Sequence, residues 1–431
     1  MSPALPSSLR QAHTGMRYGL LGFALAFVAL PLYVHLPHVY ASRYHMSLTT
    51  LGGVLLLARV LDAWMDPAIG RLGDRWYARS PRHALAVAAV AAVVLALSMA
   101  LLFFPPWNPT DNTVAVLATL MLTYVSFSTV TITHQAWAAR LANTDTQRAQ
   151  VVAWREGFGL LGVMAASLLP SWLGWDAWLG VFGLAMLAGW YAWQTCPAPV
   201  AGMPNATPDG PADMLVPWRS NAFRQLMLVF VLSGLASAIP ATLVIFFIQD
   251  LLQAPDQEAL FLGIYFFAAA AAMPVWMRGI ARWGLARCWL AGMVLSVGVF
   301  IWTTQLAGGD VIAFTWICAL SGVALATDLS IPSAMLASVI AERGEIGRHE
   351  GAYFGWWTMA SKFNLALAAG LTLPLLSWLG YQPASHSPQG LQALTWAYAV
   401  LPCALKLMAA FTLYLAFVRA TSLHFSPQSE A

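Results

Sequence analysis

The fold is decided by Leu56-Leu57-Ala58-Arg59-Val60-Leu61-Asp62-Ala63-Trp64-Met65-Asp66-Pro67, where three charges lie inside an apolar run of membrane length. Arg59, Asp62 and Asp66 are spaced at i, i+3 and i+7, so a helix places them on one stripe within reach of one another. A charge at the centre of a bilayer costs roughly 2.5–3.5 kcal/mol on insertion scales. We therefore expect the stripe to face partner side chains, water or an ion, which marks it as a functional site.

The composition excludes a soluble globular protein. Hydrophobic residues make up 59% of the 431 residues and charged residues only 9%, and the mean hydropathy is +0.67. These values indicate a polytopic membrane protein. The net charge of +3 is scattered, so no nucleic-acid partner is expected. Met1–Met16 carries no signal-peptide cleavage site, and the four cysteines have no metal-like spacing.

Twelve apolar runs have about the 20 residues needed to cross ~30 Å of hydrocarbon. They lie near residues 17–41, 48–73, 84–104, 113–140, 149–173, 176–195, 223–250, 258–280, 286–306, 311–341, 351–379 and 391–419. If both termini are cytoplasmic, the arginines that flank these spans lie on the cytoplasmic side, with Arg43 as the exception. The predicted fold class is an all-α polytopic protein of the inner (cytoplasmic) membrane with twelve transmembrane helices.

A proline-rich stretch from Cys196 to Ser220 separates six spans from six. We predict an N-terminal six-helix bundle at 1–196 with the cation site, a cytoplasmic linker at 197–221 and a C-terminal six-helix bundle at 222–431. A shift of 207 residues places Arg155 on Lys362, which indicates a repeat. The acidic pair is not repeated.

Asp62 and Asp66 are the predicted cation-coupling residues. The alternative is a structural salt bridge to Arg59, but one arginine cannot neutralise two carboxylates, and the remaining negative charge suits a proton or a small cation. Acids inside a membrane are rarely without a function.

Seven further residues of the spans, four charged and three aromatic, are candidates for the substrate cavity or gate. These candidates are Arg59, Arg155, Asp328, Tyr353, Trp356, Trp357 and Lys362. Alternatives stay open for three of them: Arg155 can form a structural pair with Glu156, Asp328 can cap an unwound segment before Pro332, and Lys362 can snorkel. Lys406 can pair with an acid of another span, and His134 is expected to be hydrogen-bonded.

Gly70-Arg71-Leu72-Gly73-Asp74-Arg75 closes the second span on the cytoplasmic side. We predict that Gly70, Asp74 and Arg75 form a conformational latch, because Asp74 can interact with neighbouring helix termini and arginines. An ordinary positively charged loop is the alternative.

These motifs resemble a known family. Ala58-Arg59-Val60-Leu61-Asp62-Ala63-Trp64-Met65-Asp66-Pro67 with Gly70 is similar to the second-span signature of the glycoside-pentoside-hexuronide cation symporters, which include the melibiose carrier and belong to the major facilitator superfamily. Three further segments are similar to the same group's pattern in spans one, ten and eleven. They are Tyr18-Gly19, Pro332-Ser333-Ala334-Met335-Leu336-Ala337, and Glu350-Gly351-Ala352-Tyr353-Phe354-Gly355 with Lys362. The resemblance implies that Asp62 and Asp66 are cation-site carboxylates and that Arg155 and Lys362 line a central cavity between two bundles.

This chain departs from the melibiose carriers at two positions. Met65 stands where they have an asparagine, and a thioether is a poor ligand for Na⁺, which favours H⁺. Ala26 stands where they have a sugar-binding aspartate. Because lysophospholipid symporters resemble the same branch, an amphipathic lipid substrate is an alternative to a sugar.

The expected function is cation-coupled symport of a small organic solute, such as a sugar or glycoside, by alternating access, with H⁺ favoured over Na⁺. A lysolipid or other amphipathic-solute symporter and a proton-coupled efflux antiporter stay open as alternatives. The sequence has no catalytic metal spacing, phosphate loop or nucleophile elbow, so no enzyme, cofactor, catalytic residue or metal site is expected. The expected partners are the solute, the coupling ion and the lipid bilayer, and the expected state is a monomer.

Overall fold

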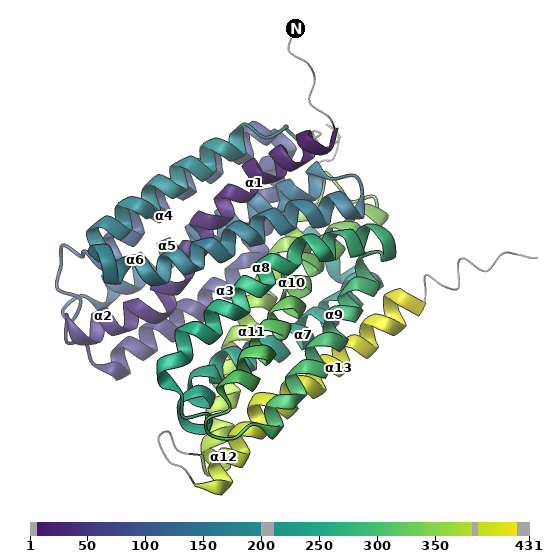
Figure 1. Ribbon diagram of the computed structural model, residues 1–431. Helices are drawn as coiled ribbons and strands as arrows, with labels where there is room; N and C mark the ends of the chain where they lie inside the picture. Colours follow the sequence, from purple (N-terminus) through teal and green to yellow (C-terminus); the bar gives the residue numbers. More distant parts are fainter. Residues whose placement is uncertain (1–6, 200–210, 382–386, 420–431) are drawn as a thin grey trace, which may run out of the picture. The chain divides into compact units, whose positions relative to one another are not determined.

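The computed structural model describes residues 7–199, 211–381 and 387–419, and these ranges contain helices and no strands (Figure 1). Its α-helices are α1 (Ser7–Leu30), α2 (Leu36–Ser42), α3 (Leu48–Arg79), α4 (Pro81–Phe103), α5 (Thr113–Leu141), α6 (Asp145–Gln194), α7 (Asn221–Phe246), α8 (Glu258–Trp283), α9 (Leu285–Phe300), α10 (Val311–Glu342), α11 (Glu350–Trp378), α12 (Pro388–Thr395) and α13 (Leu401–Leu413). Short π- and 3-10 segments extend or join them: η1 (Pro31–His35), η2 (Pro211–Arg219), η3 (Phe247–Leu251), η4 (Pro255–Gln257), η5 (Ile301–Gln305), η6 (Trp396–Val400) and η7 (Tyr414–Val418).

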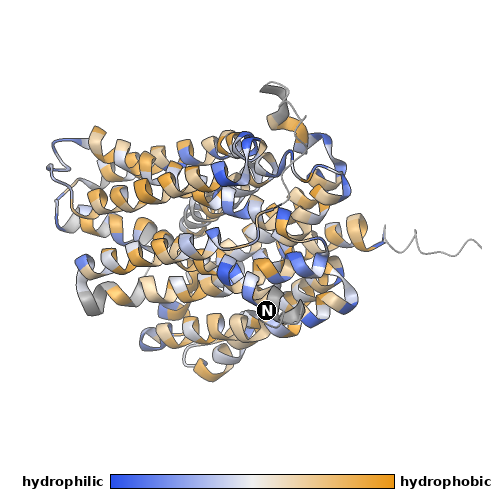
Figure 2. Cartoon of the chain, turned by 90° about the horizontal axis from the view of Figure 1, so that it is seen from above, coloured by the Kyte–Doolittle hydropathy of each residue, from blue (hydrophilic) through white to orange (hydrophobic). Residues whose placement is uncertain are grey.

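Eight helical segments of the described ranges are long and apolar enough to cross a membrane. They are Pro81–Phe103, Thr113–Leu141, Asn221–Leu251, Pro255–Trp283, Leu285–Gln305, Val311–Glu342, Glu350–Trp378 and Pro388–Val418. Hydrophobic residues cover most of the helices in Figure 2. An all-helical protein with several membrane-length helices is thus confirmed. The other expected spans fall on α1 with α2, on α3 and on α6, and the total of twelve and the side of the termini stay predictions.

The chain divides into two compact units. The first unit consists of Met1–Pro217 with Ile340–Met359, and the second consists of Trp218–Val339 with Ala360–Ala431. Helices α10 and α11 therefore each contribute residues to both units. The predicted bundle boundaries at 1–196, 197–221 and 222–431 stay a prediction.

Helix starts and one helix break follow from local sequence. Ser47, Ser80, Asn112, Thr144, Ser220 and Ser387 are N-cap residues whose side chains accept a hydrogen bond from the backbone N–H three positions later. The long helix α6 contains one non-helical residue, Gly174, with φ 78° and ψ 171°. Glycine adopts this conformation at little cost, so the spans expected at 149–173 and 176–195 form one element with a kink.

Glycines bring α1 and α6 into backbone contact in the first unit. A Cβ atom built on Gly162 would lie within 3.0 Å of the backbone of Phe23, and one on Gly19 would lie 2.7 Å from the carbonyl carbon of Trp154. Small residues allow this close approach between membrane helices. The two helices can pack this closely only where a glycine of one helix faces the backbone of the other, so the glycine positions determine how α1 and α6 align.

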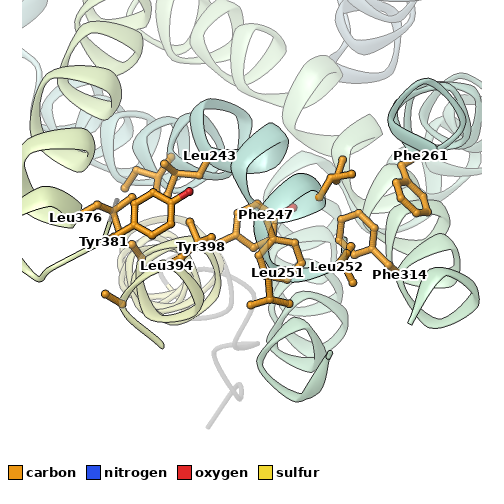
Figure 3. Close-up of a cluster of buried hydrophobic side chains, with 14 of the residues drawn as sticks. Leu243, Phe247, Leu251, Leu252, Phe261, Phe314, Leu376, Tyr381, Leu394 and Tyr398 are labelled. Carbon is orange, nitrogen blue, oxygen red and sulfur yellow. The ribbon is translucent and has the colours of Figure 1, made fainter. Parts of the chain in front are cut away.

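The second unit contains a cluster of buried apolar side chains (Figure 3). Phe247 stacks on Tyr398 with ring centroids 4.1 Å apart, and Phe261 meets Phe314 edge to face at 4.8 Å. The Tyr381 hydroxyl donates a hydrogen bond to the Asp250 carboxylate at the edge of this cluster. Burial, and after it the bond to Asp250, raises the pKa of Tyr381, so this tyrosine stays protonated.

We predict that Gly162→Ala destabilises the protein and that Gly180→Ala does not. Both glycines lie in α6, but a Cβ atom at Gly180 meets nothing within 4 Å. Overpacking at Gly162 is expected to cost about 1–3 kcal/mol, whereas alanine at an open helical site is neutral or stabilising. Thermal unfolding in detergent measures both. Equal melting temperatures for the two variants would contradict this packing.

Candidate functional site

The carboxylates of Asp62 and Asp66 lie on the buried face of α3. Their residues are 3% and 0% exposed, whereas Trp64 and Met65 are 63% and 37% exposed. The helix thus has one buried acidic stripe and one exposed apolar face, as its periodicity predicts. Arg59 is half-buried one turn before Asp62.

Helix α5 packs against α3 and presents hydroxyl groups. The Ser128 Oγ donates a hydrogen bond to Asp62 Oδ1 at 3.2 Å, and both side chains are buried. A hydroxyl can donate to a carboxylate and can also accept from a carboxylic acid. Ser128 was not predicted from the sequence, where it is one of several hydroxyl residues in an apolar helix.

Tyr18 and His134 join α1 to α5 by two reciprocal hydrogen bonds. The Tyr18 hydroxyl donates to the His134 carbonyl at 2.8 Å, and His134 Nε2 lies 3.0 Å from the Tyr18 carbonyl. A carbonyl only accepts, so Nε2 carries the proton. The two rings stack at 3.9 Å. His134 is hydrogen-bonded, as expected.

Arg155 pairs with its neighbour Glu156 on α6. The Arg155 Nε donates to Glu156 Oε1 at 3.0 Å, and Nη2 donates to the same oxygen. Both side chains are about one-fifth exposed, at 17% and 21%. This geometry fits the structural pair that the sequence left open beside a cavity role.

Asp74 caps the start of α11 within the first unit. Its Oδ1 accepts from Gly351 N at 2.6 Å and its Oδ2 accepts from Ala352 N at 2.9 Å. A carboxylate is stabilised at a helix N-terminus by the unpaired N–H groups and the helix dipole. Gly70 makes the contact close, because a Cβ atom there would lie under 3.0 Å from the Gly351 carbonyl. Arg75, the third predicted latch residue, is exposed.

A buried ion pair lies beside this cap. Arg140 Nη2 is 2.7 Å from Glu350 Oε2 and 3.9 Å from Asp74 Oδ1. The Arg140 guanidinium also lies 4.1 Å from the centre of the Tyr77 ring. All three charged side chains are at most 2% exposed. Neither Arg140 nor Glu350 was predicted as a site residue.

The acidic stripe of α3 continues into the same crossing. A Cβ atom on Gly355 would lie 2.6 Å from the Asp66 carbonyl and 2.9 Å from Pro67 Cα. Gly351 and Gly355 are four residues apart, as are Asp66 and Gly70, so one glycine-lined crossing lies directly beside the backbone of a predicted coupling residue.

Two aromatic cavity candidates on α11 make polar contacts in the first unit. The Tyr353 hydroxyl donates to Glu345 Oε2 at 2.7 Å, and Trp356 Nε1 donates to the Met214 carbonyl in η2 at 2.8 Å. Trp357 is buried, and Lys362, in the second unit, is half-buried. Their contact with a substrate stays a prediction.

The second unit contains its own charge cluster, formed by the buried Lys406 and the half-buried Asp328. Lys406 on α13 forms an ion pair with Asp328 on α10, and Trp289 Nε1 on α9 donates to Asp328 Oδ1 at 2.9 Å. Ser233 on α7 bonds to both charged groups. Lys406 therefore pairs with an acid of another helix, and Asp328 does not cap an unwound segment, since α10 continues through Pro332.

Among the described residues, no group of three or more His, Cys, Asp and Glu side chains could hold a metal ion.

Comparison with known proteins supports the transporter fold. The family model described as "MFS/sugar transport protein" matches residues 15–185 and 213–418. A bacterial homologue of the iron transporter ferroportin, in its outward-facing state, has a TM-score of 0.69 and 14% identity over 96% of this chain and 100% of its own. The fucose:proton symporter of E. coli has a TM-score of 0.68 and 12% identity over 95% and 98%. The proton:xylose symporter has a TM-score of 0.62 and 14% identity over 95% of each chain. No curated protein sequence matches.

We predict that Arg140→Met destabilises the protein more than Arg343→Met. The first change leaves Glu350 buried without its ion pair, which typically costs about 3–5 kcal/mol. Arg343 pairs with Glu345 at 2.9 Å, but its side chain is 38% exposed, and such pairs contribute roughly 0–1 kcal/mol. Thermal unfolding compares the two. If the two variants have the same melting temperature, the ion pair between Arg140 and Glu350 does not stabilise the first unit.

Proposed function

Because this chain belongs to the family of MFS/sugar transport proteins, we propose that it is a secondary active transporter for cation-coupled symport of a small organic solute, such as a sugar or glycoside. The second-span motif supports placing it among the glycoside-pentoside-hexuronide symporters, and the arginine distribution supports an inner-membrane protein with both termini cytoplasmic. In this proposal it acts as a monomer. The observation that carries the proposal is the burial of Asp62 and Asp66 on one stripe of α3.

The coupling ion in this proposal is a proton. Burial disfavours a charged carboxylate, so a proton that binds Asp62 or Asp66 removes a cost. Ser128 can donate to the Asp62 carboxylate and can accept from its protonated form, so it serves both states. Na⁺ needs several oxygen ligands, and Met65, one of the three residues between the two acids, has a thioether on the exposed face.

Proton binding drives solute uptake only if the bound proton raises the affinity of the carrier for the solute, and the bound solute raises its affinity for the proton. We propose that protonation of the acidic pair raises the affinity for the solute and that the loaded carrier then reorients. Protonation removes negative charge from α3 close to the point where this helix crosses α11. At that crossing Gly70 of α3 lies against Gly351 and Gly355 of α11. Because α11 contributes to both units, release of its first turns from Asp74 is the step that we assign to reorientation.

Two other transport functions remain as alternatives. The first alternative is symport of an amphipathic lipid. It is supported by Ala26, an apolar residue at the position where the melibiose carriers have a sugar-binding aspartate. A proton-coupled efflux antiporter could use the same acidic pair. The direction of solute movement in proteoliposomes under an imposed pH gradient distinguishes symport from antiport.

We predict that Asp62→Asn and Asp66→Asn each abolish gradient-driven accumulation. Asparagine keeps the size of the side chain but cannot take up a proton, so coupling should fall about tenfold or more. The measurement is uptake of xylose or fucose by proteoliposomes with an inside-alkaline pH gradient. Asp111→Asn, an exposed outer-loop control, should accumulate sugar as the wild type does. Unchanged accumulation in either α3 variant would refute the coupling role of that residue.

We also predict that uptake depends on pH and not on Na⁺. Exchange of Na⁺ for K⁺ at constant pH should leave the initial rate unchanged, because no step of the proposed cycle binds Na⁺. Dissipation of the pH gradient should remove accumulation. A rate that follows Na⁺ concentration at constant pH would show that the ion was assigned incorrectly, while leaving Asp62 and Asp66 as its site.

A further inference from the structure

The buried lysine of the second unit uses all of its hydrogen-bonding capacity. Lys406 Nζ donates to Asp328 Oδ2, to Ser233 Oγ at 2.9 Å and to Ser237 Oγ at 3.1 Å. An ammonium group has three N–H donors, so none remains for a ligand. The Lys406 side chain is 4% exposed.

Its partner Asp328 keeps acceptor capacity. Oδ1 accepts from Trp289 Nε1 at 2.9 Å and from Ser233 Oγ at 3.3 Å, and Oδ2 accepts from Lys406. A carboxylate has about four lone-pair sites, and the described contacts occupy three. The Asp328 side chain is 17% exposed, about four times as much as that of Lys406. The carboxylate is therefore the open member of the pair.

The chemistry of this opening selects for a neutral hydrogen-bond donor. The Lys406 ammonium lies against the same carboxylate, so it repels a cation that approaches Asp328. The carboxylate also repels an anion. A hydroxyl group has neither penalty, and its bond to an ionised acceptor is strong.

We propose that Asp328 is a solute-binding residue for a hydroxyl group of a neutral polyol or sugar, and that Lys406, Ser233 and Trp289 are positioning residues that orient its carboxylate. This assignment rests on the proposed function, because it names the substrate class of the carrier. The four side chains come from α7, α9, α10 and α13, so four helices fix the acceptor before the solute arrives. The competing explanation is that the pair only holds these helices together.

The test separates stability from binding in purified, detergent-solubilised protein without any gradient. Asp328→Asn alone leaves the Lys406 ammonium without its counter-charge and should lower the melting temperature. Asp328→Asn combined with Lys406→Met removes both charges and should restore it. Xylose and fucose should raise the melting temperature of the wild type and of Asp256→Asn, an exposed control in the same unit. In the double variant the half-maximal sugar concentration should rise about tenfold or more.

Two outcomes overturn the proposal. A double variant that regains its melting temperature and keeps the wild-type sugar response would make the pair structural only. A wild type that responds to neither sugar would overturn the polyol assignment. Because no gradient is used, either failure is distinct from a failure of coupling at Asp62 and Asp66.

A milder variant covers the case in which the double variant does not fold. Ser233→Ala removes the hydrogen bond to Asp328 Oδ1 and the one that the Ser233 hydroxyl accepts from Lys406 Nζ, and it changes the packing little. The half-maximal sugar concentration should rise about threefold or more, as expected for loss of a neutral hydrogen bond that orients the acceptor. An unchanged concentration in this variant would also overturn the proposal.

Discussion

The cost of a bare charge in an apolar interior governs this structure. Three acids are stabilised by fixed groups: the buried Glu350 by Arg140, the buried Asp74 by the first N–H groups of α11, and the half-buried Asp328 by Lys406. Asp62 accepts a hydrogen bond from the neutral hydroxyl of Ser128. A cation or a helix end holds an acid in its ionised form, whereas a hydroxyl can serve both protonation states. Glu350 and Asp74 thus have structural partners, and we assign proton exchange to Asp62 and Asp66.

Glycines in the first unit bring the proposed proton-binding residue Asp66 and the Asp74 cap of α11 to the same helix crossing. At Gly70, Gly351 and Gly355 the backbones of α3 and α11 approach so closely that no Cβ atom fits. The Asp66 carbonyl lies in this crossing and the Asp74 cap lies at its end. A helix pair without intervening side chains transmits small shifts directly, since packed interiors do not deform continuously. We infer that proton binding on α3 and the hold on α11 are linked through this backbone contact.

The sequence predicted those features that depend on local periodicity. A helical period over Arg59, Asp62 and Asp66 suffices to predict their shared stripe, and the burial of Asp62 and Asp66 agrees with it. Partners far away in the chain could not be predicted: Asp74 bonds to a residue 277 positions later, and Arg140 to one 210 positions later. Trp356, a candidate for the substrate cavity or gate, donates its indole N–H to the Met214 carbonyl in η2, and no pattern in the sequence predicts this contact.

The central claim is that a buried carboxylate of α3 takes up and releases the coupling proton. Infrared difference spectroscopy on the purified protein across a pH titration tests it most directly, because a protonated carboxylic acid has its own carbonyl stretching band. The account predicts a band that appears as the pH falls, that shifts when solute is added, and that is lost in Asp62→Asn or Asp66→Asn but kept in Asp111→Asn. A spectrum in which no such band depends on either α3 residue would contradict it.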